Sequence, residues 1–465
     1  MRRWLLLPLV LAGCDKAAPP HAAPAAKSAA ATAVQDPCAK AQLEGPIAWI
    51  HDDYDAALSC AKSKGVPLVI DLWAPWCHTC LSMKNTVLSN ASFAADAQKF
   101  VFAALDTDRE HNAPALAKFP IAAWPTYYVV ATDETVLARF VGAANTAQFR
   151  AFLGTGLQAA AGDLPAGHAA FLLAAERALV TKDLKTADLQ LSMAVSQAPV
   201  DWARLPDALV SWIATKRKLG DFAACLDLAD SFSDKLGKTA STSDFWSYAM
   251  TCADGLLEGK PDPVQVSRVS KLRNQAVARW RGLLRDPQAS LSVDDRSDAL
   301  VNLRETLIAL EQPTAAKAVA EEQRALLDAA AMKAPSPMAA MTYNAHRAEV
   351  YVYLGRPLDL VPALHKSVQD LPTEYDPPAR LGWIYLKAGK LQEAATWTDN
   401  ALTLVRGPRT ARLLGQRAEI AKALGDKVGE KQFRERAVQV LEALPTSQVT
   451  PELIAQAKQA LAALH

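Results

Sequence analysis

Apolar and polar positions follow two different periods along this chain. Residues 66–72 form a nearly continuous apolar run interrupted by Asp71, which predicts a strand buried on both faces. Further runs predict strands at 100–105, 125–130 and 136–141, and then a helix at 148–161. Beyond Gly162 these runs stop, and apolar residues recur at helical spacing. The pattern therefore predicts an α/β domain over residues 36–160 and an all-α region after it.

The all-α region contains helix breakers about every 15–20 residues. Examples are Gly220-Asp221, Gly259-Lys260-Pro261, Gln312-Pro313, Gly355-Arg356-Pro357 and Gly389-Lys390. Glycines at 355, 389 and 425 are 34 and 36 residues apart, and 34 residues is the tetratricopeptide repeat period. We expect tetratricopeptide-like repeats over 336–465 and helix pairs without a secure repeat over 163–335. Such arrays bind a peptide or protein partner on their concave surface. Alternatively, the repeats serve only as a structural spacer.

The N-terminus resembles a bacterial lipoprotein signal. A basic start at residues 1–3 precedes a short apolar stretch, and small residues lead to Cys14. The resemblance implies that residues 1–13 are cleaved and that Cys14 carries a lipid anchor on the periplasmic side of the bacterial cell envelope. Residues 14–35 are rich in alanine and proline, as in a tether. An ordinary secretory peptide is the alternative, and it too leads to a compartment where disulfides persist.

Composition excludes several classes of protein. The 465 residues are 51% apolar and 21% charged, as in globular proteins rather than disordered chains. Lys and Arg total 50 against 49 Asp and Glu, so the net charge of +1 provides no general attraction for nucleic acid. We find no apolar run of the roughly 20 residues that a membrane-spanning helix needs.

The candidate chemistry follows the first buried strand. Cys77-His78-Thr79-Cys80 opens a helical pattern, so Cys77 is expected at a helix N-terminus, where unpaired N–H groups stabilise a thiolate. Cys80 lies on the same helix face and can form a disulfide with Cys77. Asp71 stands in the preceding apolar strand, where a charged carboxylate costs several kcal/mol unless it is paired or neutral. This spacing predicts a redox pair with a carboxylate beneath it.

These motifs together resemble thioredoxin. They are Trp-Cys-x-x-Cys at 76–80, Trp-Pro-Thr at 124–126 and a glycine at 142 after the last strand. Residues 46–160 are most similar to the C-terminal periplasmic domain of DsbD-type thiol:disulfide interchange reductases. The resemblance implies a protein-disulfide reductase with four site residues. Cys77 is the attacking thiol, Cys80 the resolving thiol, Asp71 the buried carboxylate that exchanges a proton with Cys80, and Pro125 the cis proline facing the disulfide.

Three more residues are candidate docking positions for a protein thiol or disulfide substrate, namely Trp76, His78 and Trp124. His78 and Thr79 stand where thioredoxin has Gly-Pro, and Trp124 before the proline is unusual. We expect His78 to be exposed and mostly neutral at pH 7, which favours a reducing potential. A reductase then needs an electron donor, for which we expect a membrane reductase. We expect no cofactor beyond the Cys77–Cys80 disulfide, and no metal.

Two other functions stay open. In a metallochaperone the pair of cysteines would carry Cu(I), and a related alternative makes the pair half of a zinc site. In an envelope assembly scaffold the repeats would carry the main function and redox activity would be secondary.

Without Cys14 the chain has six cysteines, which fits three pairs. We expect structural disulfides between Cys38 and Cys60 and between Cys225 and Cys252.

Overall fold

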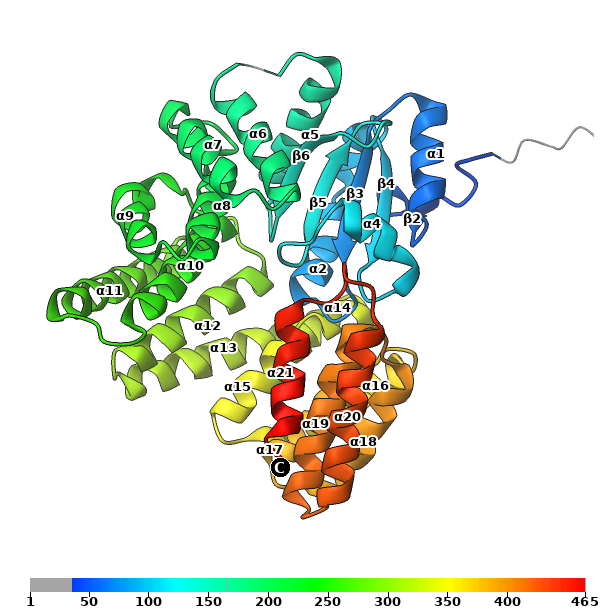
Figure 1. The fold of residues 1–465 in the computed structure, drawn as a ribbon, viewed down its shortest axis with the longest axis vertical. Helices are drawn as coiled ribbons and strands as arrows, with labels where there is room; N and C mark the ends of the chain where they lie inside the picture. Colours follow the sequence, from blue (N-terminus) through cyan, green and yellow to red (C-terminus); the bar gives the residue numbers. More distant parts are fainter. Residues whose placement is uncertain (1–35, 165, 465) are drawn as a thin grey trace, which may run out of the picture. The chain divides into compact units, whose positions relative to one another are not determined.

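The structure is a computed structural model that describes residues 36–164 and 166–464 (Figure 1). The predicted signal peptide, Cys14 and the whole of the predicted tether lie outside these residues. The first part of the described chain is a six-stranded mixed sheet with helices on both faces. Its elements are β1 (Gln42–Glu44), β2 (Ile47–His51), α1 (Tyr54–Lys64), β3 (Leu68–Trp73), α2 (His78–Met83), α3 (Ala94–Ala97), β4 (Val101–Asp106), α4 (Ala113–Lys118), β5 (Thr126–Val130), β6 (Val136–Val141) and α5 (Thr146–Ala161).

The strand order in this sheet is β1-β2-β4-β3-β5-β6. Strand β3 runs parallel to β4 and antiparallel to β5, so it is the buried central strand that the apolar run predicted. It begins at Leu68 rather than Val66, and β5 begins at Thr126 rather than Pro125. In both cases a proline stands just before the strand, where its missing N–H cannot serve the ladder.

Alternate residues of β3 face two different helical layers. Leu68, Ile70 and Leu72 pack in the core with α1 and α4. Val69 packs on the opposite face in the core with α2 and α5, where aromatic side chains fill the space. Asp71 shares the face of Val69, because side chains along a strand alternate with a period of two. The carboxylate is therefore on the side of the sheet that α2 covers.

The rest of the chain is helical (Figure 1). Its helices are α6 (His168–Val180), α7 (Leu184–Gln197), α8 (Leu205–Lys218), α9 (Phe222–Phe232), α10 (Ala240–Leu257), α11 (Pro263–Arg285), α12 (Val293–Ala309), α13 (Pro313–Lys333), α14 (Pro337–Met341), α15 (Asn344–Tyr353), α16 (Val361–Asp370), α17 (Asp376–Lys387), α18 (Leu391–Leu404), α19 (Pro408–Ala423), α20 (Lys427–Ala443) and α21 (Pro451–Ala462). Within the described residues, none of these helices is long and apolar enough to cross a bilayer.

The glycines of the predicted repeat end helices. Gly355, Gly389 and Gly425 have positive φ angles of 73°, 71° and 79°, a conformation that glycine adopts without steric cost at a helix C-terminus. Gly382 has a different role, since a methyl group there would overlap the hydroxyl of Thr398 on the next helix. A small residue where two helices cross and a glycine at the turn are both typical of a tetratricopeptide-like helix pair.

Candidate functional site

The redox motif lies where β3 leads into α2. Cys77 caps the N-terminus of α2, and its sulfur accepts a hydrogen bond of 3.0 Å from the backbone N–H of Cys80. The two sulfurs form a disulfide, and the residues are only 3% and 5% exposed. When the disulfide is reduced, the same N–H and the helix dipole would stabilise a thiolate on Cys77.

Asp71 is buried on the α2 face of the sheet. Burial raises its pKa to about 7, although the positive charge of Lys84 acts in the opposite direction. One carboxyl oxygen has no hydrogen-bond partner among the residues that the structure describes, and the same holds for the hydroxyl of Tyr127. Tyr127 is the register partner of Asp71 on β5, so the two side chains share one face. A carboxyl group in this state can take up or release a proton near neutral pH.

Two tryptophans lie beside the disulfide motif. The rings of Trp76 and Trp124 meet edge to face with centroids 4.9 Å apart. The Trp76 indole donates a 2.7 Å hydrogen bond to Asp108, and the Trp124 indole donates a 2.8 Å hydrogen bond to Thr107. The Trp124–Pro125 peptide bond is cis. These contacts hold both rings in fixed orientations next to the motif.

The surroundings of His78 differ from the sequence-based expectation of an exposed, neutral side chain. The His78 side chain is 27% exposed, and its Nδ1 donates to the carboxylate of Asp294, 3.0 Å away and 1% exposed. Burial alone would lower the pKa of His78, but the charges of Asp294 and then Asp298 outweigh it and raise the pKa to about 10. A positive charge beside Cys77 stabilises a thiolate. The reason that the sequence offered for a strongly reducing potential is therefore weakened.

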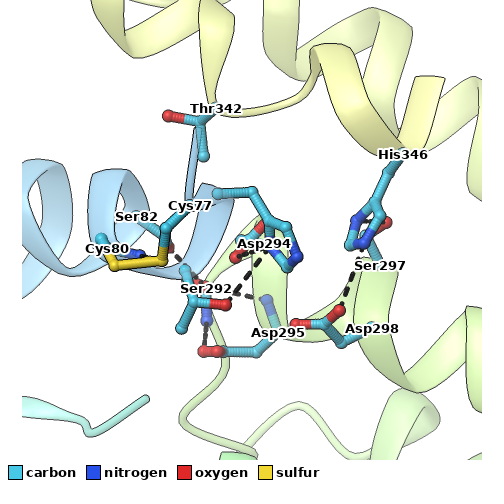
Figure 2. Close-up of polar contacts among 12 residues, drawn as sticks. Cys77, Cys80, Ser82, Ser292, Asp294, Asp295, Ser297, Asp298, Thr342 and His346 are labelled. Atoms are coloured by element: carbon cyan, nitrogen blue, oxygen red, sulfur yellow. Dashed lines mark hydrogen bonds and ion pairs between the residues drawn. A yellow bond between two sulfur atoms is a disulfide. The ribbon is translucent and has the colours of Figure 1, made fainter. Parts of the chain in front are cut away.

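Helices α12 and α14 meet the redox motif from the helical region (Figure 2). The Ser82 hydroxyl donates to Ser292 at 3.1 Å, and the Asn85 amide contacts Thr342 at 3.4 Å. Together with the His78–Asp294 pair, these bonds hold α2 against residues more than 200 positions away in the sequence. The described helices therefore form part of the redox site.

A cavity of about 1000 Å³ lies on the tryptophan side of the motif. Trp76 and Trp124 line it together with Arg409 and Arg412 of α19. The Arg409 guanidinium lies 3.2 Å from the centre of the Trp76 ring, a cation–π contact. The cavity is large enough for an extended peptide segment, because ligand clefts commonly measure about 300–1,000 Å³.

The remaining candidate cysteines lie away from this site. Cys38 and Cys60 form one disulfide, and Cys225 and Cys252 form another between α9 and α10. Neither pair is among the residues that line the cavity. They cross-link local structure and leave Cys77–Cys80 as the pair at the helix N-terminus.

The sequence analysis missed every site residue that comes from the helical region. Asp294 stands in the first turn of α12, where an acidic residue is usual because of the helix dipole, so no feature of the sequence singled it out. Asp298, His346 and Arg409 likewise match no local motif. Only the tertiary fold brings them to residues 76–80.

One family model and several solved structures match parts of this chain. Residues 49–131 match a family model described as thioredoxin-like. Two solved structures are similar in part: a tetratricopeptide repeat protein from Parabacteroides merdae (14% identity, 63% of this chain, 98% of that chain, TM-score 0.41) and YrrB, a TPR protein with an unusual peptide-binding site (15%, 46%, 99%, 0.24). No curated protein matches this chain. The predicted fold class is confirmed: the chain has a thioredoxin-like α/β domain followed by tetratricopeptide-like helical repeats.

Proposed function

We propose that this protein is a thiol:disulfide oxidoreductase that acts on disulfides of other proteins. The observation that carries the proposal is the Cys77–Cys80 disulfide at the N-terminus of α2, on the face of the sheet that also holds the buried Asp71. Zinc or Cu(I) carriage would use the same two sulfurs. The buried carboxyl group, however, serves proton transfer to a thiol and has no part in metal carriage, so it favours the redox function.

The proposed reaction moves two electrons from the dithiol to a substrate disulfide. The Cys77 thiolate attacks one substrate sulfur, so the substrate S–S bond breaks and a mixed disulfide forms while the leaving thiolate takes a proton. Cys80 then gives its proton to Asp71 and attacks the Cys77 sulfur. The Cys77–Cys80 bond forms as the mixed disulfide between Cys77 and the substrate breaks. The second substrate sulfur leaves as a thiolate that takes up a proton, and both substrate sulfurs are then reduced.

The helical region would position the substrate for this reaction. Cys77 is 3% exposed, so a substrate disulfide needs a defined approach. The cavity lined by Trp76 and Trp124 provides one, because it lies directly beside the motif. A strand of the partner protein placed there would also contact the arginines of α19. Repeats that present a partner to the cysteines explain why one chain carries both parts.

The proposed function includes a membrane anchor and a direction of electron transfer. A lipid on Cys14 would hold the enzyme on the periplasmic side of the bacterial envelope, where disulfides persist. Because the resemblance is to a reductase domain, we assign the reducing or isomerising direction. The oxidised pair must then be reduced again by another protein dithiol, for which a membrane reductase is the proposed donor.

The test is a mixed-disulfide trap with insulin as a defined disulfide substrate. With Cys80→Ser in the full mature chain, Cys77 should form a covalent adduct with an insulin chain that dithiothreitol releases. Cys77→Ser should give at most about one hundredth as much adduct, because its remaining thiol, Cys80, lacks the position at the helix N-terminus that stabilises a thiolate. Equal adduct from both variants would contradict the assigned roles.

The scaffold alternative requires a separate test in cells of the producing organism. If a chain carrying Cys77→Ser together with Cys80→Ser still restores a deletion phenotype, the repeats alone carry the function. Loss of rescue by this double variant, with normal protein levels, supports the oxidoreductase.

A further inference from the structure

A second cluster of chemically reactive side chains lies on the helical side of His78. One potential ligand atom from each of His78, Asp298 and His346 lies within 4.8 Å of the others. The three residues come from α2, α12 and α15, so they bridge the thioredoxin-like domain and the helical region. The sequence analysis predicted no metal site, and no spacing in the sequence connects these positions.

The outer contacts of both histidines orient them as metal ligands usually are. Nδ1 of His78 bonds to the carboxylate of Asp294 at 3.0 Å, and Nδ1 of His346 bonds to the hydroxyl of Ser297 at 2.8 Å (Figure 2). Metal-binding histidines characteristically donate one ring N–H to a carboxylate or another oxygen and bind the metal through the other nitrogen. In both rings Nε2 is therefore the nitrogen left for a ligand.

Two of the three candidate ligand atoms are already as far apart as two ligands of one metal ion. Nε2 of His346 is 3.3 Å from Oδ1 of Asp298. Two ligands at about 2.0–2.1 Å from a tetrahedral Zn²⁺ are about 3.3 Å apart. The His78 ring lies against the His346 ring, with centroids 4.2 Å apart and planes tilted by 49°. A rotation of the His78 side chain that brings its ring nitrogen closer to this pair would complete a three-ligand site.

The charges around the cluster also favour a cation. Asp294 is buried directly behind His78. Asp244 and Asp295 line a cavity of about 130 Å³ together with Asp298. A single positive charge on His78 offsets at most one of these carboxylates, so a cation bound at the cluster would lower the remaining electrostatic cost.

We propose that His78, Asp298 and His346 bind one divalent transition-metal ion. Two imidazoles and one carboxylate match the ligand set of Zn²⁺ sites that keep a fourth position for water. Room for that water is provided by the partial exposure of the Asp298 and His78 side chains, 34% and 27%. The ion would cross-link α2, which carries the redox pair, to α12 and α15. This proposal does not rest on the proposed redox function.

The experiment measures binding of Zn²⁺ to the full mature chain after removal of metals with a chelator and with Cys77–Cys80 oxidised. We expect one equivalent to bind in calorimetry. Co²⁺ should bind at the same place and give d–d absorption bands without a thiolate charge-transfer band, because no sulfur is a ligand. Mn²⁺ should bind more weakly than Zn²⁺, as the affinity series of divalent ions requires.

Variants assign the ligands. His346→Gln and Asp298→Asn should each weaken Zn²⁺ binding at least 10-fold, and Asp294→Asn should weaken it about 10- to 100-fold through its hold on His78. His365→Gln is the matched control, since His365 lies on α16 next to Trp397 and outside the cluster. It should leave the affinity unchanged. The Asp298 side chain is 34% exposed against 8% for His346, so the Asp298 variant keeps the test valid if His346→Gln fails to fold.

Three results would overturn the proposal. The first is the absence of stoichiometric Zn²⁺ binding by the oxidised wild-type chain. The second is binding that is equal in wild type, His346→Gln and Asp298→Asn. The third is binding that appears only after reduction and disappears in the Cys77→Ser, Cys80→Ser double variant, which would make the cysteines the ligands.

Discussion

Replacement of Asp71 by asparagine is expected to slow the resolving step of Cys80 about 100-fold at pH 7. The first step, attack by the Cys77 thiolate on a substrate disulfide, should change less than about 3-fold, because it needs no proton from Asp71. The difference between wild type and variant should shrink above about pH 8.5, where a cysteine thiol ionises without help. Stopped-flow tryptophan fluorescence during insulin reduction can separate the two steps.

The same substitution is expected to stabilise the protein at alkaline pH. The pKa of Asp71 is raised from 3.8 to about 7 by burial, so the folded state favours the protonated carboxyl group. Stability from that proton is complete below about pH 4 and is lost as pH rises through 7. Asparagine stays neutral throughout. Its advantage in unfolding free energy should grow between pH 4 and 7 and reach up to about 4 kcal/mol above it.

The control for both measurements is Asp163→Asn, the same change at an exposed residue that follows α5. It should alter neither the resolving rate nor the pH dependence of stability. If Asp71→Asn resolves mixed disulfides at the wild-type rate from pH 6 to 9, Asp71 has a structural role only.

Arg204→Met is expected to cost about 3–5 kcal/mol of unfolding free energy at pH 8. Arg204 is 2% exposed and bonds to Glu176 at 2.8 Å and to Asp207 at 2.7 Å. Its guanidinium also donates to the carbonyl of Arg139 on the edge strand β6, and Glu176 accepts from the Arg139 N–H. The ion pair thus satisfies backbone groups of the sheet edge and joins it to α6 and α8.

The pH dependence of this loss has a definite sign. Burial raises the pKa of Glu176 to about 7 even though the charge of Arg204 opposes it. Without Arg204 this pKa rises further, so the unpaired carboxylate is neutralised at low pH and the loss should be smaller at pH 5. Urea unfolding at both pH values measures it. Arg356→Met, in an exposed pair with Asp359, is the control and should cost less than about 1 kcal/mol. Equal losses in the two variants would contradict this account.

The sequence was sufficient to predict the central strand of the sheet and the helix that begins at the Cys77–Cys80 motif. The run at 66–72 marked the central strand because a strand buried on both faces has few polar residues. The Cys77–Cys80 motif marked a helix N-terminus, because a helical pattern begins at the motif directly after the buried strand. The breaker positions gave the helix ends, since a glycine such as Gly389 adopts a left-handed turn that other residues avoid.

The residues of the helical region that contact the redox motif could not be predicted from local patterns in the sequence. Asp294 and His346 meet His78 through the packing of α12 and α15, and contacts over more than 200 residues leave no period or spacing in one sequence. The expectation that His78 is neutral failed for this reason. A residue that is exposed in an isolated thioredoxin-like domain is partly covered here by a helical region of the same chain.

The most direct test of the central claim is a redox titration of Cys77–Cys80 in the full mature chain. The chain is equilibrated in glutathione and dithiothreitol buffers of known potential, and the two cysteines are then alkylated and counted by mass spectrometry. We predict one reversible two-electron transition between about −270 and −180 mV, the range from thioredoxin to protein disulfide isomerase. A midpoint near −120 mV would overturn the reducing direction, and a pair that shows no reversible transition would contradict the redox function itself.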